Sequence, residues 1–232
     1  MVPYYVIIIL FLALGFYVQY RLKSKFTQYS KQALSNGLSG AEIAQKMLDD
    51  HNITDVRIQS VAGKLTDHYN PLNKTVNLSP EVYSGRSVSA AAVAAHEVGH
   101  AVQHAVGYKW LDMRSKLVPM ANFSGQIMNF VIMSMFFGFY FAQGTLFSFE
   151  NIILILIVTQ SVITAFTLIT LPVEYDASNR ALAWLTSTGT INASEHNKAA
   201  DALTWAARTY LVAALASMAQ LAYYISLLSG RD

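Results

Sequence analysis

The chain of 232 residues contains no cysteine. A disulfide framework and a cysteine-ligated metal are therefore both excluded, and a zinc ion would have to be held by histidine and carboxylate side chains. Charged residues are also scarce: they make up 13% of the chain, about half the usual share in a soluble domain, whereas 53% of the residues are hydrophobic. Basic clusters interleaved with aromatic residues are lacking, so we expect no nucleic-acid partner. This composition predicts a membrane protein.

Four apolar runs are long enough to cross a bilayer as helices. The first, within residues 1–20, lacks the cleavage site and the preceding positive charges of a signal peptide, so we expect a permanent anchor. Residues 117–142 and 151–171 predict a helical hairpin over 117–171. Residues 210–228 predict a fourth membrane helix, which with a short tail makes up the segment 209–232.

The distribution of Lys and Arg predicts the orientation of these spans. With the N-terminus outside, segments 21–116 and 172–208 lie in the cytoplasm. All 16 Lys and Arg residues except Arg231 then lie on the cytoplasmic side, in agreement with the positive-inside rule. The two polar segments thus reach the same aqueous face, although the hairpin separates them in sequence, and can contribute to one site.

Short regular elements are predicted in the first polar segment. Ser39-Gly40-Ala41-Glu42 has the capping-box pattern, which predicts a helix from residue 40 to about residue 50. Residues 56–61 and 75–78 alternate between apolar and polar side chains and predict a small antiparallel sheet. The strand at 75–79 could be an edge that holds extended substrate through main-chain hydrogen bonds, or it could be purely structural.

The motif His96-Glu97-Val98-Gly99-His100 follows in a strongly apolar setting. On a helix, His96 and His100 lie on the same face and can direct ring nitrogens at one ion. Glu97 then lies beside the open coordination position, where a carboxylate can take a proton from water. Burying two imidazoles and a carboxylate without partners is costly, so this pattern predicts a site for one zinc ion.

The helix that carries the motif is expected to begin after Ser87 or Ser89 and to end near Val106. His104 lies one turn beyond His100, but ligands at i, i+4 and i+8 drift around a helix. We therefore expect His104 to have a supporting or surface role. Gln103 and Val106 stand where the metzincin extension of this motif has Gly and His, so that extension is excluded.

A third ligand is expected after the hairpin, in the polar stretch that follows Pro172. Glu174 and Asp176 are two residues apart and face different directions on a helix, so only one of them reaches the ion easily. Glutamate is the usual carboxylate in a site with two histidines, which favours Glu174 and leaves Asp176 to accept from a ligand imidazole. Asp176 and His196 are the alternative ligands.

Three amide side chains share one face of the second predicted span: Asn122, Gln126 and Asn129. Such a face avoids lipid. We interpret it as a source of interhelical hydrogen bonds, in preference to a polar cavity that admits substrate.

The motif and two further stretches carry a family resemblance. Residues 65–71, 94–101 and 171–178 resemble the YugP-type neutral zinc metallopeptidases of bacterial membranes, and the likeness covers nearly the whole chain. That family in turn resembles gluzincin membrane proteases, in which the helix with the third ligand reads Glu-x-x-Ala-Asp. The resemblance implies that Glu174 is the third ligand, with Ser178 in place of the Asp. It also implies location in a bacterial plasma membrane.

These observations predict a mainly α-helical membrane protein with a small β-sheet, four transmembrane helices and a cytoplasmic zincin-like α+β metalloprotease domain. The expected activity is hydrolysis of peptide bonds in a peptide or membrane-protein substrate, with His96, His100 and Glu174 as zinc ligands and Glu97 as general base. The donor to the oxyanion is left open among His68, Tyr69, Tyr175 and Arg180.

Two other functions are compatible with the composition. A zinc-stabilised membrane scaffold that binds partner proteins would have the same ligands but no need for Glu97 as a base. A transporter is disfavoured, because the ionisable residues lie near the ends of the spans and not at mid-membrane. Association with a second copy or with another protein is left open.

Overall fold

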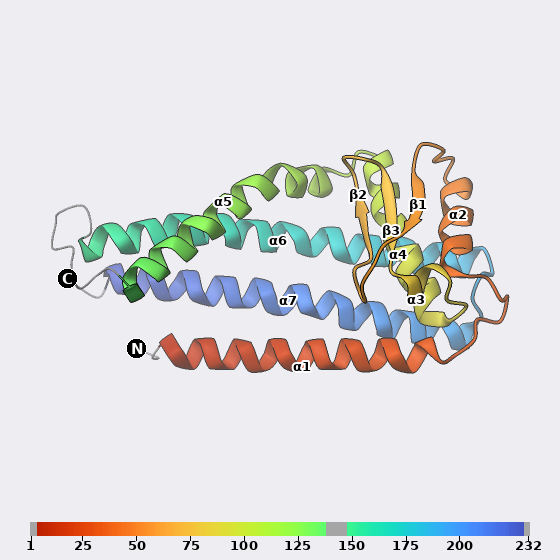
Figure 1. Cartoon of the computed structure of the whole chain (residues 1–232), viewed down its shortest axis with the longest axis horizontal. Coiled ribbons are helices and arrows are strands. Elements are labelled where there is room, and N and C mark those ends of the chain that lie inside the picture. Colours follow the sequence, from red (N-terminus) through yellow and green to blue (C-terminus); the bar gives the residue numbers. More distant parts are fainter. Residues whose placement is uncertain (1–3, 138–147, 230–232) are drawn as a thin grey trace. The chain divides into compact units, whose positions relative to one another are not determined.

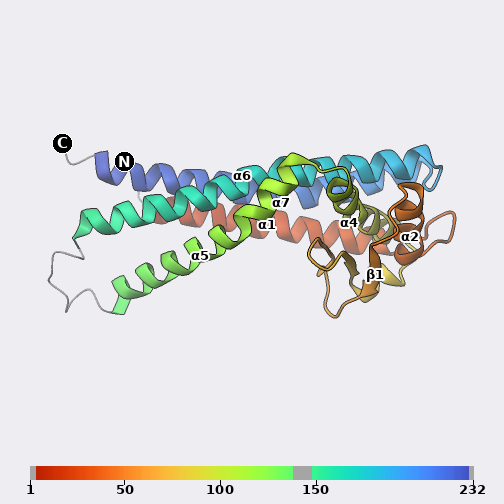
Figure 2. The ribbon, with the colours of Figure 1, turned by 90° about the horizontal axis from the view of Figure 1, so that it is seen from above.

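The computed structural model describes residues 4–137 and 148–229 (Figures 1 and 2). The chain forms two compact units. One, here called the apolar unit, comprises residues 1–15, 113–171 and 210–232, and the other, the mixed unit, comprises residues 16–112 and 172–209. Four long helices contribute residues to both units: α1 (Tyr4–Ser30), α5 (Lys109–Phe137), α6 (Phe149–Ser187) and α7 (Ala193–Ser229).

The mixed unit contains all the strands of the described chain. Its remaining elements are α2 (Gly40–Asp50), β1 (Arg57–Ser60), β2 (His68–Asn70), β3 (Thr75–Leu78), α3 (Pro80–Tyr83) and α4 (Val88–Ala105). The predicted helix at 40–50 is confirmed together with its capping box: the Ser39 hydroxyl accepts from the Glu42 N–H, and the Glu42 carboxylate accepts from the Ser39 N–H. Of the two serines proposed to cap α4, Ser87 does so.

The sheet differs from the expected antiparallel pair. The strand order is β1-β3-β2, with β1 parallel and β2 antiparallel to β3. Of the two alternatives for residues 75–79, an edge that holds substrate is excluded, since β3 is the central strand and is buried along its whole length. The edge strands are β1 and β2, and the three residues of β2 are too few to show a period-two pattern in the sequence.

Small side chains allow α4 to pack closely in the core of the mixed unit. Six alanines of α4 are buried: Ala90, Ala91, Ala92, Ala94, Ala95 and Ala101. Around them lie Ile43 and Met47 of α2 and Val76 and Leu78 of β3, all fully buried. Burial of aliphatic side chains is the main stabilising contribution here, at about 25 cal/mol per Å² of apolar surface.

The apolar unit includes most of α5 (Lys109–Phe137) and the apolar parts of α1, α6 and α7. Its core contains Met128 of α5, Ile153 and Leu156 of α6, and Tyr224 of α7. Polar side chains join α6 to α7: Gln160 Nε2 donates to the Ser217 carbonyl at 3.1 Å, and the Thr164 hydroxyl donates to the same carbonyl at 3.2 Å.

The expected four spanning helices are corrected to three. Among the described residues, α1, α6 and α7 are long and apolar enough to cross a membrane, and α5 is not. Asn122, Gln126 and Asn129 lower the hydropathy of α5, and residues 138–147, which include the end of the predicted span and most of the predicted connection, lie outside the described residues. The span predicted at 210–228 is part of a longer helix, α7, which begins at Ala193.

The interhelical hydrogen bonds expected of these three amides are not present among the described residues. All three side chains are exposed on α5 in the apolar unit. The face that they share in the sequence is therefore exposed and has no hydrogen-bond partner within the described residues.

Candidate metal centre

Helices α4 and α6 bring three ligand-type side chains together in the mixed unit. One donor atom from each of His96, His100 and Glu174 lies within 4.8 Å of the others. Glu174 Oε2 is 3.4 Å from His96 Nε2 and 3.6 Å from His100 Nε2. Two ligands about 2.1 Å from a tetrahedral zinc ion lie about 3.4 Å apart, so the donor positions fit such an ion.

The three side chains of this cluster are mostly buried, whereas most groups of charged residues lie exposed on a protein surface. The side chains of His100 and Glu174 are only 8% and 3% exposed, and that of His96 is 12% exposed. Burying three polar or charged groups away from water costs free energy, and this cost must be offset by a bound cation or by hydrogen bonds.

A glycine allows the two helices to approach one another. A Cβ at Gly99, within the motif, would lie 2.6 Å from the carbonyl oxygen of Ala177 on α6. A methyl group does not fit at that distance, so α4 would have to move away from α6. The second-last residue of the motif therefore helps to place Glu174 opposite the two imidazoles.

Glu97 lies beside the cluster and outside the ligand set. It is buried, and its Oε2 accepts a hydrogen bond from the Tyr69 N–H of β2 at 3.0 Å. Burial raises the pKa of the Glu97 carboxyl to about 7; the His96 imidazole and the Tyr69 N–H oppose this rise, while the Glu174 and Asp67 carboxylates add to it. A carboxyl group with a pKa near neutrality is suited to both accept and return a proton.

Asp67 fixes the start of β2 next to Glu97. Its carboxylate accepts from the N–H of Ser79 at 2.7 Å and from the Ser79 hydroxyl at 3.0 Å. Burial raises the pKa of Asp67, although the hydrogen bonds from Ser79 favour its charged form. This contact ties β2 to the end of β3 and so holds the Tyr69 N–H in place.

Gln103 holds the His100 imidazole. The Gln103 Nε2 donates to the Val173 carbonyl and to Asp176 Oδ2, both at 2.8 Å, so its Oε1 is left as the acceptor that lies 3.0 Å from His100 Nδ1. The proton of His100 is thereby assigned to Nδ1, and Nε2 offers its lone pair toward Glu174. Gln103 is fully buried.

Asp176 and Ser178 support the two histidines from α6. The expected contact of Asp176 with a ligand imidazole is indirect, because Gln103 lies between them, and Asp176 Oδ2 also accepts from Arg180 Nε at 2.5 Å. The Ser178 hydroxyl lies 3.1 Å from His96 Nδ1. Ser178 thus contacts a ligand at the position where the wider gluzincin pattern has Asp.

The other sequence candidates lie apart from the cluster. His196 contacts the Thr186 hydroxyl, and His68 contacts the Thr66 carbonyl. Tyr175 is 42% exposed. Arg180 pairs with Asp176. Of the four proposed oxyanion donors, Tyr69 contacts Glu97, but through its backbone N–H.

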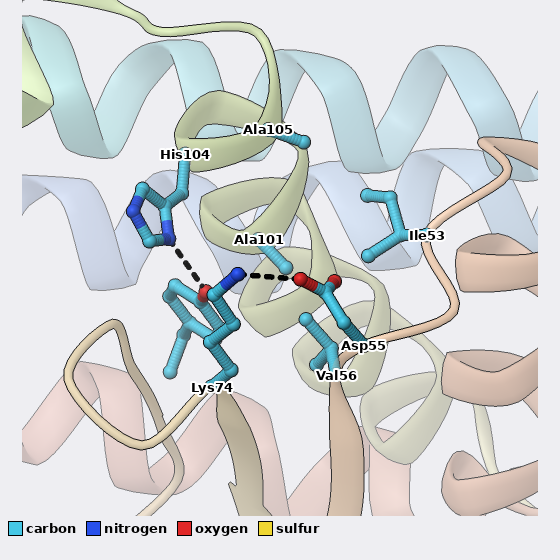
Figure 3. A pocket seen from close by; sticks show the side chains of 8 residues that line it. Ile53, Asp55, Val56, Lys74, Ala101, His104 and Ala105 are labelled. Carbon is cyan, nitrogen blue, oxygen red and sulfur yellow. Dashed lines mark hydrogen bonds and ion pairs between the residues drawn. The ribbon is translucent and has the colours of Figure 1, made fainter.

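A pocket of about 350 Å³ adjoins the site (Figure 3). Its lining includes Ala101, which follows His100, and Tyr69 and His104. Burial raises the pKa of the Tyr69 phenol to about 12, so the phenol stays protonated, and its oxygen lies 2.8 Å from His104 Nδ1. His104 is exposed and lies outside the cluster of His96, His100 and Glu174. Asp55 and Lys74 form an ion pair across the pocket.

Comparison with known proteins agrees with this geometry. Residues 4–229 match the protein family described as "Putative neutral zinc metallopeptidase". The chain belongs to this family. A curated relative, "Putative membrane protease YugP" of Bacillus subtilis, is 42% identical over 222 residues, which cover 95% of each chain. No solved structure shows significant similarity. Membership of the family implies zinc, and the cluster of His96, His100 and Glu174 offers a place for it.

Sequence reasoning missed Gln103 and the Tyr69 N–H as parts of the site. Gln103 carried one signal, since it is a polar residue three positions after His100 in an otherwise apolar helix and so shares its face. No signal in the sequence indicated the role of the Tyr69 N–H, because this contact is made by the backbone and does not depend on the side chain.

We predict that Gly99→Ala destabilises the protein by about 1–3 kcal/mol, because the added methyl group would press on the Ala177 carbonyl, and that it weakens zinc binding by displacing α4 from α6. Thermal unfolding and zinc titration of the detergent-solubilised protein measure both effects.

Gly125→Ala in α5 is the matched control, since a Cβ there meets nothing within 4 Å. It should be neutral or stabilising, as Ala favours a helix over Gly by about 0.5–1 kcal/mol. Equal behaviour of the two variants would contradict the role of Gly99.

We predict that Gln103→Leu lowers zinc affinity about 10- to 100-fold, because His100 loses the acceptor that fixes its tautomer. Competition with a chromophoric zinc chelator measures the change. Gln45→Leu on the exposed face of α2 serves as the control and should bind zinc as the wild type does. Wild-type affinity in Gln103→Leu would rule out the positioning role.

Proposed function

We propose that this protein is a membrane-embedded zinc endopeptidase in which His96, His100 and Glu174 hold one catalytic ion and Glu97 is the general base. The observation that carries the proposal is the buried cluster of three donors at separations suited to zinc, with a buried carboxyl group of raised pKa beside it. The name of the Bacillus subtilis relative, a membrane protease, supports the reaction class.

A zinc ion bound by these residues would act as a Lewis acid toward the scissile carbonyl and would lower the pKa of water. Glu97 accepts the proton of the attacking water and returns it to the nitrogen of the leaving amine. The Tyr69 N–H keeps the Glu97 carboxylate oriented through both transfers. Gln103 and Ser178 contact Nδ1 of the two imidazoles, so that Nε2 of each lies near Glu174 and would be available to bind zinc.

We assign the substrate-binding edge to β2 instead of β3. β2 is one of the two edge strands, and its Tyr69 N–H lies against the proposed general base. An extended peptide beside β2 would bring its carbonyl groups toward Glu97. The pocket lined by Ala101, Ala105 and Ile53 then offers space for a substrate side chain.

We further propose that α5 crosses the membrane as the partner of α6, with the mixed unit in the cytoplasm. His100 precedes the apolar part of α6 and Glu174 follows it, yet the two side chains lie in one cluster. A single crossing between them would leave them on opposite sides of the bilayer. An even number of crossings is required. Although α5 is less apolar than the three candidate spans, it is the long helix of the described chain that lies between His100 and α6 in the sequence, and we propose it as the second crossing.

The general base is tested by Glu97→Gln, which we expect to retain stoichiometric zinc and to lower the cleavage rate by about 10²- to 10⁴-fold, because an amide cannot accept the proton. Quantitative proteomics of membranes that carry either form should reveal fragments made by the wild type and not by the variant. Metal content is measured on the purified proteins.

Two further variants make this experiment decisive. Glu81→Gln, an exposed acid of α3, should leave cleavage unchanged. His100→Ala should lose zinc, and stoichiometric zinc in that variant would refute the ligand assignment. Full cleavage by Glu97→Gln would remove Glu97 from its role, and the absence of any fragment difference would favour the scaffold function.

The topology is tested with single cysteines, for which a chain free of cysteine is well suited. We expect a membrane-impermeant maleimide added outside to label Ser148→Cys and to spare Gln45→Cys and Asn197→Cys. Of these three positions, only Ser148 would face outward in the proposed topology. All three residues are exposed. Labelling of all three from the same side would contradict the crossing of α5.

A further inference from the structure

Two arginines of the mixed unit lie against one tryptophan, outside the metal centre. The guanidinium carbon of Arg21, on α1, is 4.9 Å from the centroid of the Trp205 ring on α7, and that of Arg208 is 4.2 Å from it. The Tyr17 ring packs edge-on against the same indole, with the centroids 6.0 Å apart. We call Arg21, Trp205 and Arg208 the guanidinium–indole cluster.

The positive charge of this cluster is not balanced by the chain. Within the part of the chain that the structure describes, neither Arg21 nor Arg208 forms an ion pair with a carboxylate. The nearby acid of α7, Asp201, already binds Lys25 Nζ at 2.8 Å and the Tyr29 hydroxyl at 2.6 Å. Two cations held on one ring repel one another, so an anion would stabilise the arrangement.

A buried donor in the cluster also lacks an acceptor. The Nε of Arg21 is buried and has no hydrogen-bond partner among the described residues. A buried guanidinium N–H without a partner costs free energy, so such a group is normally found with an acceptor. Charge and hydrogen bonding therefore point to the same kind of ligand, an anion with several oxygens.

The position of the cluster in the sequence indicates its depth in the membrane. Arg21 directly follows the first apolar run, and Arg208 comes two residues before the last one. Trp205 and Tyr17 are the residue types that gather at the level of lipid headgroups. Basic side chains at such helix ends meet the phosphate groups of lipids.

We propose that Arg21 and Arg208, held against Trp205, bind the phosphate of an anionic phospholipid headgroup. Guanidinium groups present paired N–H donors that match two phosphate oxygens, and stacking on the indole orients them before the lipid arrives. Because two positive charges are compensated, a headgroup with a net negative charge binds more tightly than a zwitterionic one.

Native mass spectrometry of the full-length protein in a neutral detergent tests the proposal. The protein is titrated separately with phosphatidylglycerol, phosphatidylcholine and inorganic phosphate. We expect phosphatidylglycerol to bind more tightly than the other two. Arg21→Gln and Arg208→Gln should each weaken phosphatidylglycerol binding about fivefold, the effect of one basic residue at a lipid surface.

Matched variants separate this site from general charge attraction. Lys23→Gln removes the same charge from an exposed position of α1 and should change the affinity less than twofold. Arg208→Lys keeps the charge but loses the planar paired donors, and should bind with intermediate affinity. Zinc content shows that each variant is folded, and the readout does not depend on proteolysis.

Three results would overturn the proposal. Equal weakening by Lys23→Gln and by the two arginine variants would show diffuse attraction only. Equal affinity for phosphatidylglycerol and phosphatidylcholine would remove the role of the unbalanced charge. Binding of inorganic phosphate as tightly as phosphatidylglycerol would identify a site for a soluble anion and not for a lipid.

Discussion

The close approach of α4 to α6 is the constraint on which the rest of the site depends. At Gly99 the backbone of α6 lies where a side chain of α4 would otherwise be. This contact sets the distance between the two imidazoles on α4 and the Glu174 carboxylate on α6. The alanine-rich face of α4 continues the same principle, since small side chains allow the neighbouring elements to pack tightly around a polar centre.

Close packing also excludes water, and polar groups in such a site must satisfy one another. The side chain of Gln103 accepts from one ligand and donates twice to α6, so a single amide orients an imidazole and joins two helices. The Ser178 hydroxyl contacts the His96 imidazole, and the Tyr69 N–H donates to the Glu97 carboxylate, so these two side chains are also held in place. The site is therefore preorganised by groups that are not ligands, which supports the proposed hydrolytic function.

Single continuous helices contain both apolar segments and residues of the two proposed sites. Helix α6 carries an apolar segment and then Glu174, and α1 and α7 carry apolar segments adjoining Arg21 and Arg208. His96 and His100 precede the apolar part of α6 in the sequence and Glu174 follows it, yet the three side chains lie in one cluster. The exposed amides of α5 lower the hydropathy of that helix.

Local signals in the sequence determined several features correctly. The capping box predicted α2, the alternating residues predicted β1 and β3, and the motif at 96–100 predicted that two histidines lie together in a candidate metal cluster. These predictions succeed because helix and strand periodicity place side chains three, four or two residues apart on one face. Proximity of Glu174 was inferred from the expected topology and from resemblance.

Only the tertiary structure decided the rest. It placed β2 at the edge of the sheet, inserted Gln103 between His100 and Asp176, and gathered Arg21 and Arg208 on one indole. Each of these depends on contacts between residues far apart in the chain, or on backbone groups that every residue type shares. A side-chain pattern cannot encode such contacts, because the partner is chosen by packing and not by spacing along the sequence.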